Sequence, residues 1–264
     1  MNPVTVKSGN SPVVLAQPHS GTELPDSVRA NLTPAAAGLK DTDWRIPELY
    51  EGLLPDATVV RANFNRYVID ANRSPEDEHL YPGQNTTALV PTTTFENEAV
   101  WQTPVGDEEV SARVRDFHTP YHLALQAELE RVRDLHGAVI LYDCHSIRSE
   151  LPFLFDGELP ALNVGTFDGK SCAPQITATV SEMCVDHNGF SSVVNGRFKG
   201  GWTTRHYGRP DDNIHAVQME IAQRTYLESE THPFTYSAEK AAPLRELLAA
   251  ILAQLSDLVV AKQI

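Results

Sequence analysis

Few cysteines, few basic residues and no long hydrophobic run characterise this sequence. The three cysteines, Cys144, Cys172 and Cys184, include no CxxC pair, which argues against a disulfide framework and against a cysteine-rich zinc site. The chain has 35 acidic residues against 21 lysines and arginines, and its formal net charge of -14 disfavours nucleic acid and anionic membranes as partners. No stretch approaches the roughly 20 apolar residues that span a bilayer, and no signal peptide pattern opens the chain. We therefore expect a cytoplasmic protein without membrane contact.

The hydrophobic content is sufficient for a folded α/β domain. Hydrophobic residues make up 41% of the 264 residues, which is too much for a disordered chain. We take residues 1–264 as one domain, because the sequence shows neither an internal repeat nor a low-complexity segment. The acidity does not exclude a small anionic ligand, since a few arginines inside a cleft can reverse the local potential.

The segment GAVILYDCHSIRSE, residues 137–150, organises the prediction. Its apolar run over residues 138–142 is typical of a strand that is covered on both faces. A polar cluster follows at once, consisting of Asp143, Cys144, His145, Ser146 and Arg148. Ligands of open α/β sheets bind beyond the carboxyl ends of the strands, so His145 is expected at a functional site.

Apolar patterns also predict the other elements. Strands are expected over residues 12–17, 57–62, 66–71 and 215–221, and helices over residues 34–39, 44–54, 107–136, 173–188 and 238–260. Pro120 is a candidate break within the helix over residues 107–136. Residues 74–102 are rich in Pro, Thr, Asn and Glu without periodicity, and loops of this length often form lids or pocket walls.

Histidines at strand ends, together with carboxylates, form a candidate metal site. His19 and His145 follow expected strands, and Glu23, Asp41 and Asp43 are the candidate carboxylates. Neutral imidazole and carboxylate oxygen suit Zn²⁺, which keeps one position open for water in catalytic sites. No HExxH motif is present, so the alternative, in which each histidine is an ordinary turn residue, stays open.

Glu220 and a group of donors are candidates for catalysis and substrate binding. Glu220 lies in the apolar context VQMEIA, where a buried carboxylate needs a cation or has a raised pKa suited to a general base. Its alternative is a solvent-facing position on an edge strand. Arginine presents a planar fork of donors to carboxylates, although a surface salt bridge is the alternative for any one arginine. The candidate carboxylate-binding residues are Arg66, Asn72, Arg73 and Arg197.

A serine or cysteine nucleophile is a weaker alternative. Ser20 and Ser146 each adjoin a histidine in sequence, but neither lies in a GxSxG motif. Cys144 precedes His145, and neighbours on a strand point in opposite directions. Asp70, in the segment YVIDA, is expected to hold Arg66 or Arg73 in place.

Seven segments resemble, in the same order along the chain, the N-formylglutamate amidohydrolase family, the deformylases of histidine breakdown. They cover nearly the whole sequence, and their collinear order is more specific than any one motif. The segments are PHSGTELP (residues 18–25), LKDTDWRIPELY (39–50), NRYVIDANRSPED (65–77), LYPGQNTTALVPTTTF (80–95), LYDCHSIRS (141–149), NGRFKGGWTTRHYGRP (195–210) and HAVQMEIAQRTY (215–226).

The resemblance implies a fold and a metal site. The fold would be of the zinc carboxypeptidase and aminoacylase type, a single α/β domain with a mixed twisted sheet flanked by helices. Zinc, or another divalent metal, would be held by the histidine of PHSG, the aspartate of TDW and the histidine of DCHS, which here are His19, Asp43 and His145. Glu23, four residues after His19, is the second choice for the carboxylate ligand.

The same resemblance implies the remaining roles. Glu220 of QMEI would be the general base that takes a proton from the attacking water. The substrate-binding residues would be Arg66, Asn72, Arg73, Arg197 and His206.

The implied reaction is the metal-dependent hydrolysis of N-formyl-L-glutamate, a small dicarboxylate, to formate and L-glutamate in histidine degradation. One alternative is hydrolysis of another small N-acyl or N-formyl amino acid. Another is a dicarboxylate-binding protein without catalysis. The sequence leaves open the oligomeric state and the identity of the metal.

Overall fold

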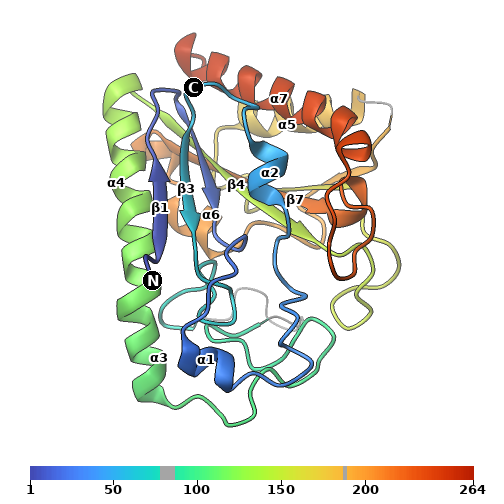
Figure 1. Ribbon diagram of the computed structural model, residues 1–264. Coiled ribbons are helices and arrows are strands. Elements are labelled where there is room, and N and C mark those ends of the chain that lie inside the picture. Colours follow the sequence, from blue (N-terminus) through green and yellow to red (C-terminus); the bar gives the residue numbers. More distant parts are fainter. Residues whose placement is uncertain (78–86, 187–188) are drawn as a thin grey trace.

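The computed structural model describes residues 1–77, 87–186 and 189–264, and a seven-stranded sheet lies at its centre (Figure 1). The order across the sheet is β1-β3-β2-β4-β7-β5-β6. β1 runs antiparallel to β3, and β5 runs antiparallel to β7, whereas the other neighbours are parallel, so the predicted mixed sheet is confirmed. The strands are β1 (Val4–Lys7), β2 (Val13–Gln17), β3 (Thr58–Ala62), β4 (Val139–Ile147), β5 (Leu162–Gly165), β6 (Ser192–Val194) and β7 (Ile214–Ala222).

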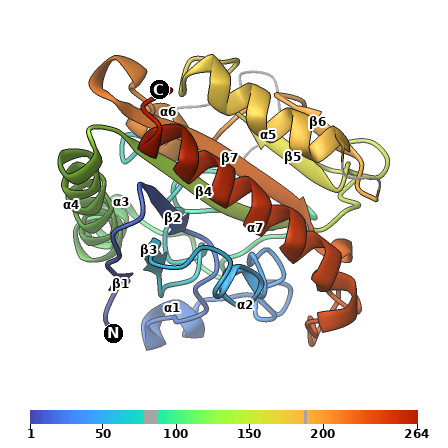
Figure 2. The ribbon, with the colours of Figure 1, turned by 90° about the horizontal axis from the view of Figure 1, so that it is seen from above.

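Helices cover both faces of the sheet, because alternate side chains of each strand form two apolar surfaces. Tyr142 of β4 and Met219 of β7 belong to the core beneath α5 and α7, whereas Leu141 and Ala216 belong to the core beneath α4. Figures 1 and 2 show α5 and α7 side by side, with α4 against the opposite face. The helices are α1 (Asp26–Ala30), α2 (Ile46–Tyr50), α3 (Asp107–Arg113), α4 (Thr119–His136), α5 (Pro174–Asp186), α6 (Trp202–Tyr207) and α7 (Ala238–Val260).

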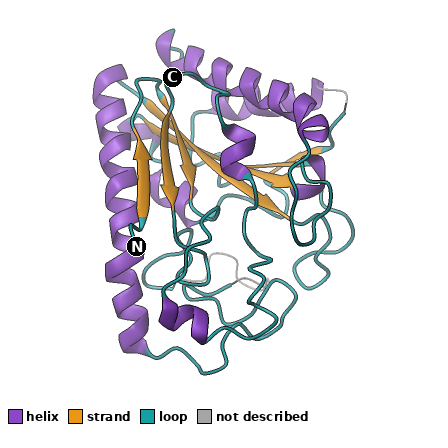
Figure 3. Ribbon diagram, in the orientation of Figure 1, coloured by secondary structure: helices purple, strands orange, loops and turns teal. Residues whose placement is uncertain are grey.

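The parallel strands β2, β4 and β7 place their carboxyl ends at one edge of the sheet. β4 and β7 pair over nine consecutive positions, from Val139 opposite Ile214 to Ile147 opposite Ala222. The loops after these strands gather below that edge (Figure 3). Side chains from distant parts of the chain therefore converge there.

The central strand is longer than the apolar run that predicted it. β4 continues through Asp143 and His145 to Ile147, and all nine of its residues are buried. Pairing with β7 keeps the backbone extended, so the polar cluster lies within the strand rather than after it.

The prediction of a strand over residues 66–71 is wrong, because this segment forms turns. The side chain of Asn65 accepts a hydrogen bond from the backbone N–H of Tyr67, at 3.0 Å, and that of Asp70 accepts one from the N–H of Asn72, at 2.8 Å. Asn and Asp side chains stabilise turns in this way. The alternating apolar residues of this segment instead enter the core beside α4.

The long helix expected over residues 107–136 is continuous but contains a π-helical turn, Val114–His118, between α3 and α4. Pro120 lies in the first turn of α4, where its missing N–H is tolerated. α7 begins and ends as predicted, and α5 covers residues 174–186 of the range 173–188, whose residues 187 and 188 lie outside the described residues.

Several other boundaries differ from the prediction. Residues 34–38 form turns rather than a helix, and the helix expected over residues 44–54 shortens to α2. The short elements β1, β5, β6, α1 and α6 were not predicted from periodicity. Part of the loop over residues 74–102 lies outside the described residues, and the rest is irregular apart from isolated bridges. Of the helices in the described ranges, none has the length and hydrophobicity needed to cross a membrane.

Candidate active site

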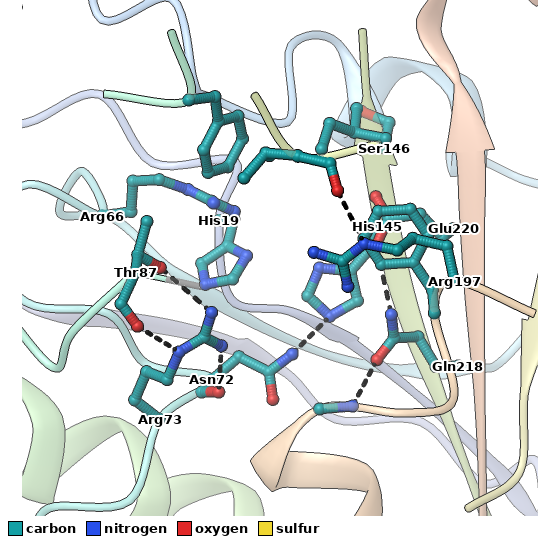
Figure 4. A pocket seen from close by; sticks show the side chains of 15 residues that line it. His19, Arg66, Asn72, Arg73, Thr87, His145, Ser146, Arg197, Gln218 and Glu220 are labelled. Atoms are coloured by element: carbon teal, nitrogen blue, oxygen red, sulfur yellow. Dashed lines mark hydrogen bonds between the residues drawn. The ribbon is translucent and has the colours of Figure 1, made fainter. Parts of the chain in front are cut away.

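A cavity of about 80 Å³ opens at the carboxyl ends of β2, β4 and β7. Figure 4 shows side chains from both halves of the chain pointing into it. Histidines, arginines and a carboxyl share its wall with apolar side chains. Its lining consists of His19, Arg66, Asn72, Arg73, Thr87, Phe95, His145, Ser146, Ile147, Leu154, Arg197, Phe198, Gly201, Gln218 and Glu220.

His19, Asp43 and His145 form one buried group. His19 follows β2, His145 lies on β4, and Asp43 lies in the turn before α2. Asp43 Oδ2 is 3.1 Å from His145 Nδ1 and 3.9 Å from His19 Nδ1, and the ring centroids of the two histidines are 5.0 Å apart. One ligand atom from each residue lies within 4.8 Å of the others, so the group could hold a metal ion.

Carboxylates face the remaining nitrogen of each ring. His19 Nε2 donates a hydrogen bond to Asp70 Oδ1 at 2.6 Å, and Asp143 Oδ2 lies 3.1 Å from His145 Nε2. His19 Nδ1 is buried and has no hydrogen-bond partner. Metal-bound histidines commonly have this arrangement, in which a carboxylate beside one nitrogen leaves the other free for the ion. The unpaired nitrogen therefore fits a metal ligand.

The charges of this group are closely coupled. Burial lowers the pKa of His19, whereas Asp143 and Asp43, against the effect of burial, hold the pKa of His145 well above its usual value. Arg66 Nη2 lies 3.1 Å from Asp43 Oδ1, and this guanidinium opposes burial so that the pKa of Asp43 is lowered. Asp43 is thus held as a carboxylate, the form that binds cations.

The other carboxylates considered from the sequence lie elsewhere. Glu23 is exposed, and its segment forms an isolated bridge with Phe64. Asp41 is buried, but it accepts a hydrogen bond from the Tyr67 hydroxyl at 2.7 Å and pairs with Arg148 at 3.0 Å. The structure therefore brings Asp43 to the two histidines, rather than Glu23 or Asp41.

Glu220 of β7 is the carboxyl that lies beside His145 and also lines the cavity. It pairs in register with His145 of β4, and register partners point to the same face of a sheet. Only 6% of Glu220 is exposed, so the solvent-facing alternative is wrong. Burial raises its pKa to about 8. Gln218 donates a hydrogen bond to Glu220 Oε2 at 3.1 Å and accepts one from the Gly201 N–H at 2.7 Å.

The four expected carboxylate-binding residues all line the cavity. Asn72 places Nδ2 3.2 Å from His145 Nε2, while its Oδ1 accepts a hydrogen bond from the Thr203 N–H at 2.8 Å. Arg73 donates to the carbonyl of Thr87 at 2.9 Å and to its hydroxyl at 3.0 Å. These contacts orient the Arg73 guanidinium along the cavity wall (Figure 4).

Arg197 and His206 differ in position. Arg197 lies on the wall opposite Arg73 (Figure 4), and its Nε donates to the Leu154 carbonyl at 3.1 Å. His206 of α6 is exposed and stacks on Trp202, with ring centroids 4.3 Å apart. It is not among the described residues that line the cavity.

The nucleophile alternatives receive little support from the geometry. Cys144 is buried in the core beneath α5 and α7, and burial raises the pKa of its thiol well above the usual value. The hydroxyl of Ser146 accepts a hydrogen bond from the Tyr226 hydroxyl at 2.7 Å and one from Gln223 at 3.3 Å. Neither histidine ring is hydrogen-bonded to a serine among the described contacts.

Three residues of the site were missed by reasoning from the sequence. Asp70, expected to hold an arginine, pairs instead with His19. Asp143 and Gln218 are register partners on β4 and β7, with side chains on the face that also carries His145 and Glu220. The segments DCHS and QMEI could have indicated Asp143 and Gln218, because polar residues at alternate positions of an apolar strand share one face.

Taken together, the fold and the site define an α/β protein with a histidine–carboxylate group and a buried glutamic acid at the ends of parallel strands. Residues 11–227 match the family model of N-formylglutamate amidohydrolases. The chain is 47% identical over 253 residues to an N-formylglutamate deformylase of Pseudomonas putida, with 93% of this chain and 94% of the relative covered. It is 42% identical over 257 residues to an N-formylglutamate deformylase of Pseudomonas aeruginosa, with 95% and 96% covered.

Solved structures agree with these sequence matches in fold. A crystal structure of N-formylglutamate amidohydrolase from Ralstonia eutropha superposes with a TM-score of 0.82 at 24% identity, covering 98% of each chain. A second structure, from Agrobacterium tumefaciens, gives a TM-score of 0.73 at 17% identity, covering 98% of this chain and 96% of the other. The chain belongs to the N-formylglutamate amidohydrolase family.

The position of Asn72 depends on a glycine at residue 201. A Cβ atom built on Gly201 would collide with the Asn72 side-chain amide. We expect Gly201→Ala to lower the free energy of unfolding by about 1–3 kcal/mol, the usual cost of overpacking, as measured by urea denaturation.

Gly106→Ala is the matched control, because Gly106 is also the extended residue before a helix and has open space around its Cα. The Gly106→Ala variant should lose no more than about 1 kcal/mol of its free energy of unfolding, the usual effect of exchanging a helix-cap residue. Equal losses in the two variants would contradict the proposed crowding.

Proposed function

We propose that this protein hydrolyses N-formyl-L-glutamate to formate and L-glutamate. The observation that carries the proposal is that His19, His145 and Glu220 line one cavity and that Asp43 is buried beside the two histidines, within a chain of the N-formylglutamate amidohydrolase family. N-Formylglutamate deformylase is also the name of both Pseudomonas relatives. The linear amide of the formyl group is the bond to be broken.

His19, Asp43 and His145 would hold a divalent metal, and zinc suits their nitrogen and oxygen donors. The buried, unpaired Nδ1 of His19 supports this assignment. When bound, such an ion polarises a carbonyl and lowers the pKa of water to about 7. Asp70 and Asp143 would keep the two rings in the orientation that directs Nδ1 toward Asp43.

Glu220 would act as the general base and then as the general acid. Its carboxylate takes a proton from the water that attacks the formyl carbon. The C–N bond then breaks, Glu220 returns the proton to the leaving nitrogen, and formate and glutamate are released. Burial raises the pKa of Glu220 above the usual value of a carboxyl, toward neutral pH, which suits a group that must both accept and release a proton. Gln218, hydrogen-bonded to Glu220 Oε2, orients the carboxyl.

Arginines on separate walls would bind the two carboxylates of the substrate. Figure 4 shows Arg73 and Arg197 on opposite sides of the cavity, with Arg66 beside His19. Arg66 is also the partner of Asp43, which ties substrate binding to the proposed metal group. A dicarboxylate can bridge two separated guanidinium groups, whereas a monocarboxylate can reach only one.

The type of domain, the metabolic pathway and the cellular compartment are proposed from the family resemblance. We place residues 1–264 in one domain of the zinc carboxypeptidase and aminoacylase type, since the two proposed histidine ligands lie toward the carboxyl ends of the parallel strands β2 and β4 in a mixed sheet. The reaction would serve histidine breakdown. The cytoplasm would suit the three free cysteines.

Release of the free amino acid, which all three compounds below give on hydrolysis, separates the proposed substrate from its rivals. We expect kcat/KM for N-formyl-L-glutamate to exceed that for N-formyl-L-aspartate and for N-acetyl-L-glutamate by about tenfold or more, because one methylene or one methyl group alters a tight pocket by about 1–3 kcal/mol. A higher value for another acyl amino acid would replace the substrate. Glutamate binding without hydrolysis of any of them would indicate a binding protein.

Removal of the metal tests the three ligands. We expect purified protein supplied with zinc to hold about one ion per chain by elemental analysis, and chelation to abolish formate release. His19→Ala and His145→Ala should each lose the ion. His136→Ala is the control, since His136 is only half-buried and donates to the Asn10 carbonyl far from the site. Full activity in thoroughly chelated protein would refute the metal-dependent mechanism.

Glu220→Gln tests the general base. The amide cannot accept the proton from water, so kcat should fall by about 100- to 10,000-fold while the metal content stays at the wild-type level. Glu239→Gln, at an exposed position in the first turn of α7, should leave kcat unchanged. Loss of the ion in Glu220→Gln would instead identify Glu220 as a ligand.

A further inference from the structure

The segment of residues 65–73 delivers much of the site without being a strand or a helix. It carries Arg66, Asp70, Asn72 and Arg73, three of which line the cavity while Asp70 pairs with His19. Turns are held by few backbone contacts, and catalytic geometry tolerates little displacement. Contacts from outside the segment must therefore fix its position.

Two histidines on the helix that passes behind this segment supply such contacts. His118 Nε2 donates a hydrogen bond to the Arg73 carbonyl at 3.0 Å, and His122 Nε2 donates one to the Ala71 carbonyl at 2.8 Å. Each nitrogen must be the donor, because a carbonyl oxygen can only accept. The two acceptors flank Asn72.

The helix presents both rings on the same side. Residues four apart lie one above the other on a helix, and the ring centroids of His118 and His122 are 4.3 Å apart. The π-helical turn Val114–His118 ends at the first of them. The Arg113 side chain, just before that turn, donates to the Val68 carbonyl at 2.9 Å, so the same helix also holds the start of the segment.

The surroundings keep His122 in one tautomer. Because Nε2 donates to the Ala71 carbonyl, it carries the proton of the neutral ring, and Nδ1, 3.1 Å from the Tyr207 hydroxyl, is the unprotonated nitrogen. The same hydroxyl donates to the His122 carbonyl at 3.2 Å. Burial lowers the pKa of His118 and lowers that of His122 well below the usual value, so both rings are neutral single donors near pH 7. Neither ring lines the cavity.

We propose that His118 and His122 form a clamp that positions Asn72 and Arg73 for substrate binding. Both are positioning residues, since neither touches the cavity. The inference rests on the proposed function, because Arg73 is assigned there to a substrate carboxylate and Asn72 lines the same cavity. Loss of the clamp shifts these two side chains and weakens binding more than it slows the chemistry at His145 and Glu220.

His122→Leu and His122→Gln form the test, with His136→Leu as the control. Gln can place an amide donor near the position of Nε2, whereas Leu cannot. We expect His122→Leu to raise KM for N-formyl-L-glutamate by about tenfold or more, with a smaller change in kcat, and His122→Gln to recover most of this loss. His136→Leu removes a histidine-to-carbonyl hydrogen bond from the far end of α4 and should leave both constants unchanged.

Hydrogen exchange gives a readout that needs no substrate. In His122→Leu, amides of residues 65–73 should exchange faster than in the wild type, with unchanged exchange in β4 and β7. If wild-type protein releases no formate, the proposed function fails, and the exchange result alone decides whether the clamp holds the segment. His118→Leu and His118→Gln carry the same test if His122→Leu does not fold.

Two outcomes would overturn the clamp. One is a His122→Leu protein with the kinetic constants and exchange of His136→Leu. The other is an equal loss of kcat and kcat/KM without a change in KM, which His122→Gln does not reverse. Faster exchange confined to residues 65–73, together with the raised KM and its recovery in His122→Gln, would establish it.

Discussion

The buried carboxylate of Asp43 is the interaction on which the rest of the site depends. It lies beside His145 and Arg66, and its Oδ2 also accepts a hydrogen bond from the Ser146 N–H at 3.1 Å. A charge buried without partners would cost several kcal/mol, so these contacts are a condition of the fold as well as of the chemistry. Since the partners come from β4 and from residues 65–73, one side chain links the sheet to the irregular segment beside it.

In β4 and β7, successive side chains point to opposite faces of the sheet, so each strand contributes alternately to the apolar core and to the site. Cys144 and Met219 point into the apolar layer beneath α5 and α7, while their neighbours His145 and Glu220 point into the cavity. A shift of one residue in the pairing of β4 with β7 would exchange these environments. Burial between two helical layers and pairing over nine positions fix the register and thus the distance between the histidine and the glutamic acid.

Features that depend on local pattern could be predicted from the sequence. A buried strand with a histidine after its apolar run led to His145, an acidic residue in an apolar run led to Glu220, and α7 was predicted at both ends. Contacts between residues that are far apart in the sequence were harder to predict. Asp70 lies 51 residues from His19, and only the folded chain brings them within 2.6 Å. The apolar alternation of residues 66–71 predicted a strand. The segment forms turns instead, because side-chain hydrogen bonds to Asn65 and Asp70 stabilise them.

The acidity of the chain is compatible with an anionic substrate, because the buried carboxylates nearest the cavity are already engaged. Asp43 pairs with Arg66, Asp70 accepts a hydrogen bond from His19, and Asp143 lies beside His145. The guanidinium of Arg73 is oriented by carbonyl and hydroxyl oxygens of Thr87, which carry no full charge, so its positive charge is not cancelled there. A divalent ion held by the group of Asp43 would add positive charge beside the cavity, although the formal net charge of the whole chain is -14. The potential that a small dicarboxylate meets is therefore set by pairing within the cavity, and the surface charge contributes little because salt screens it over about 10 Å.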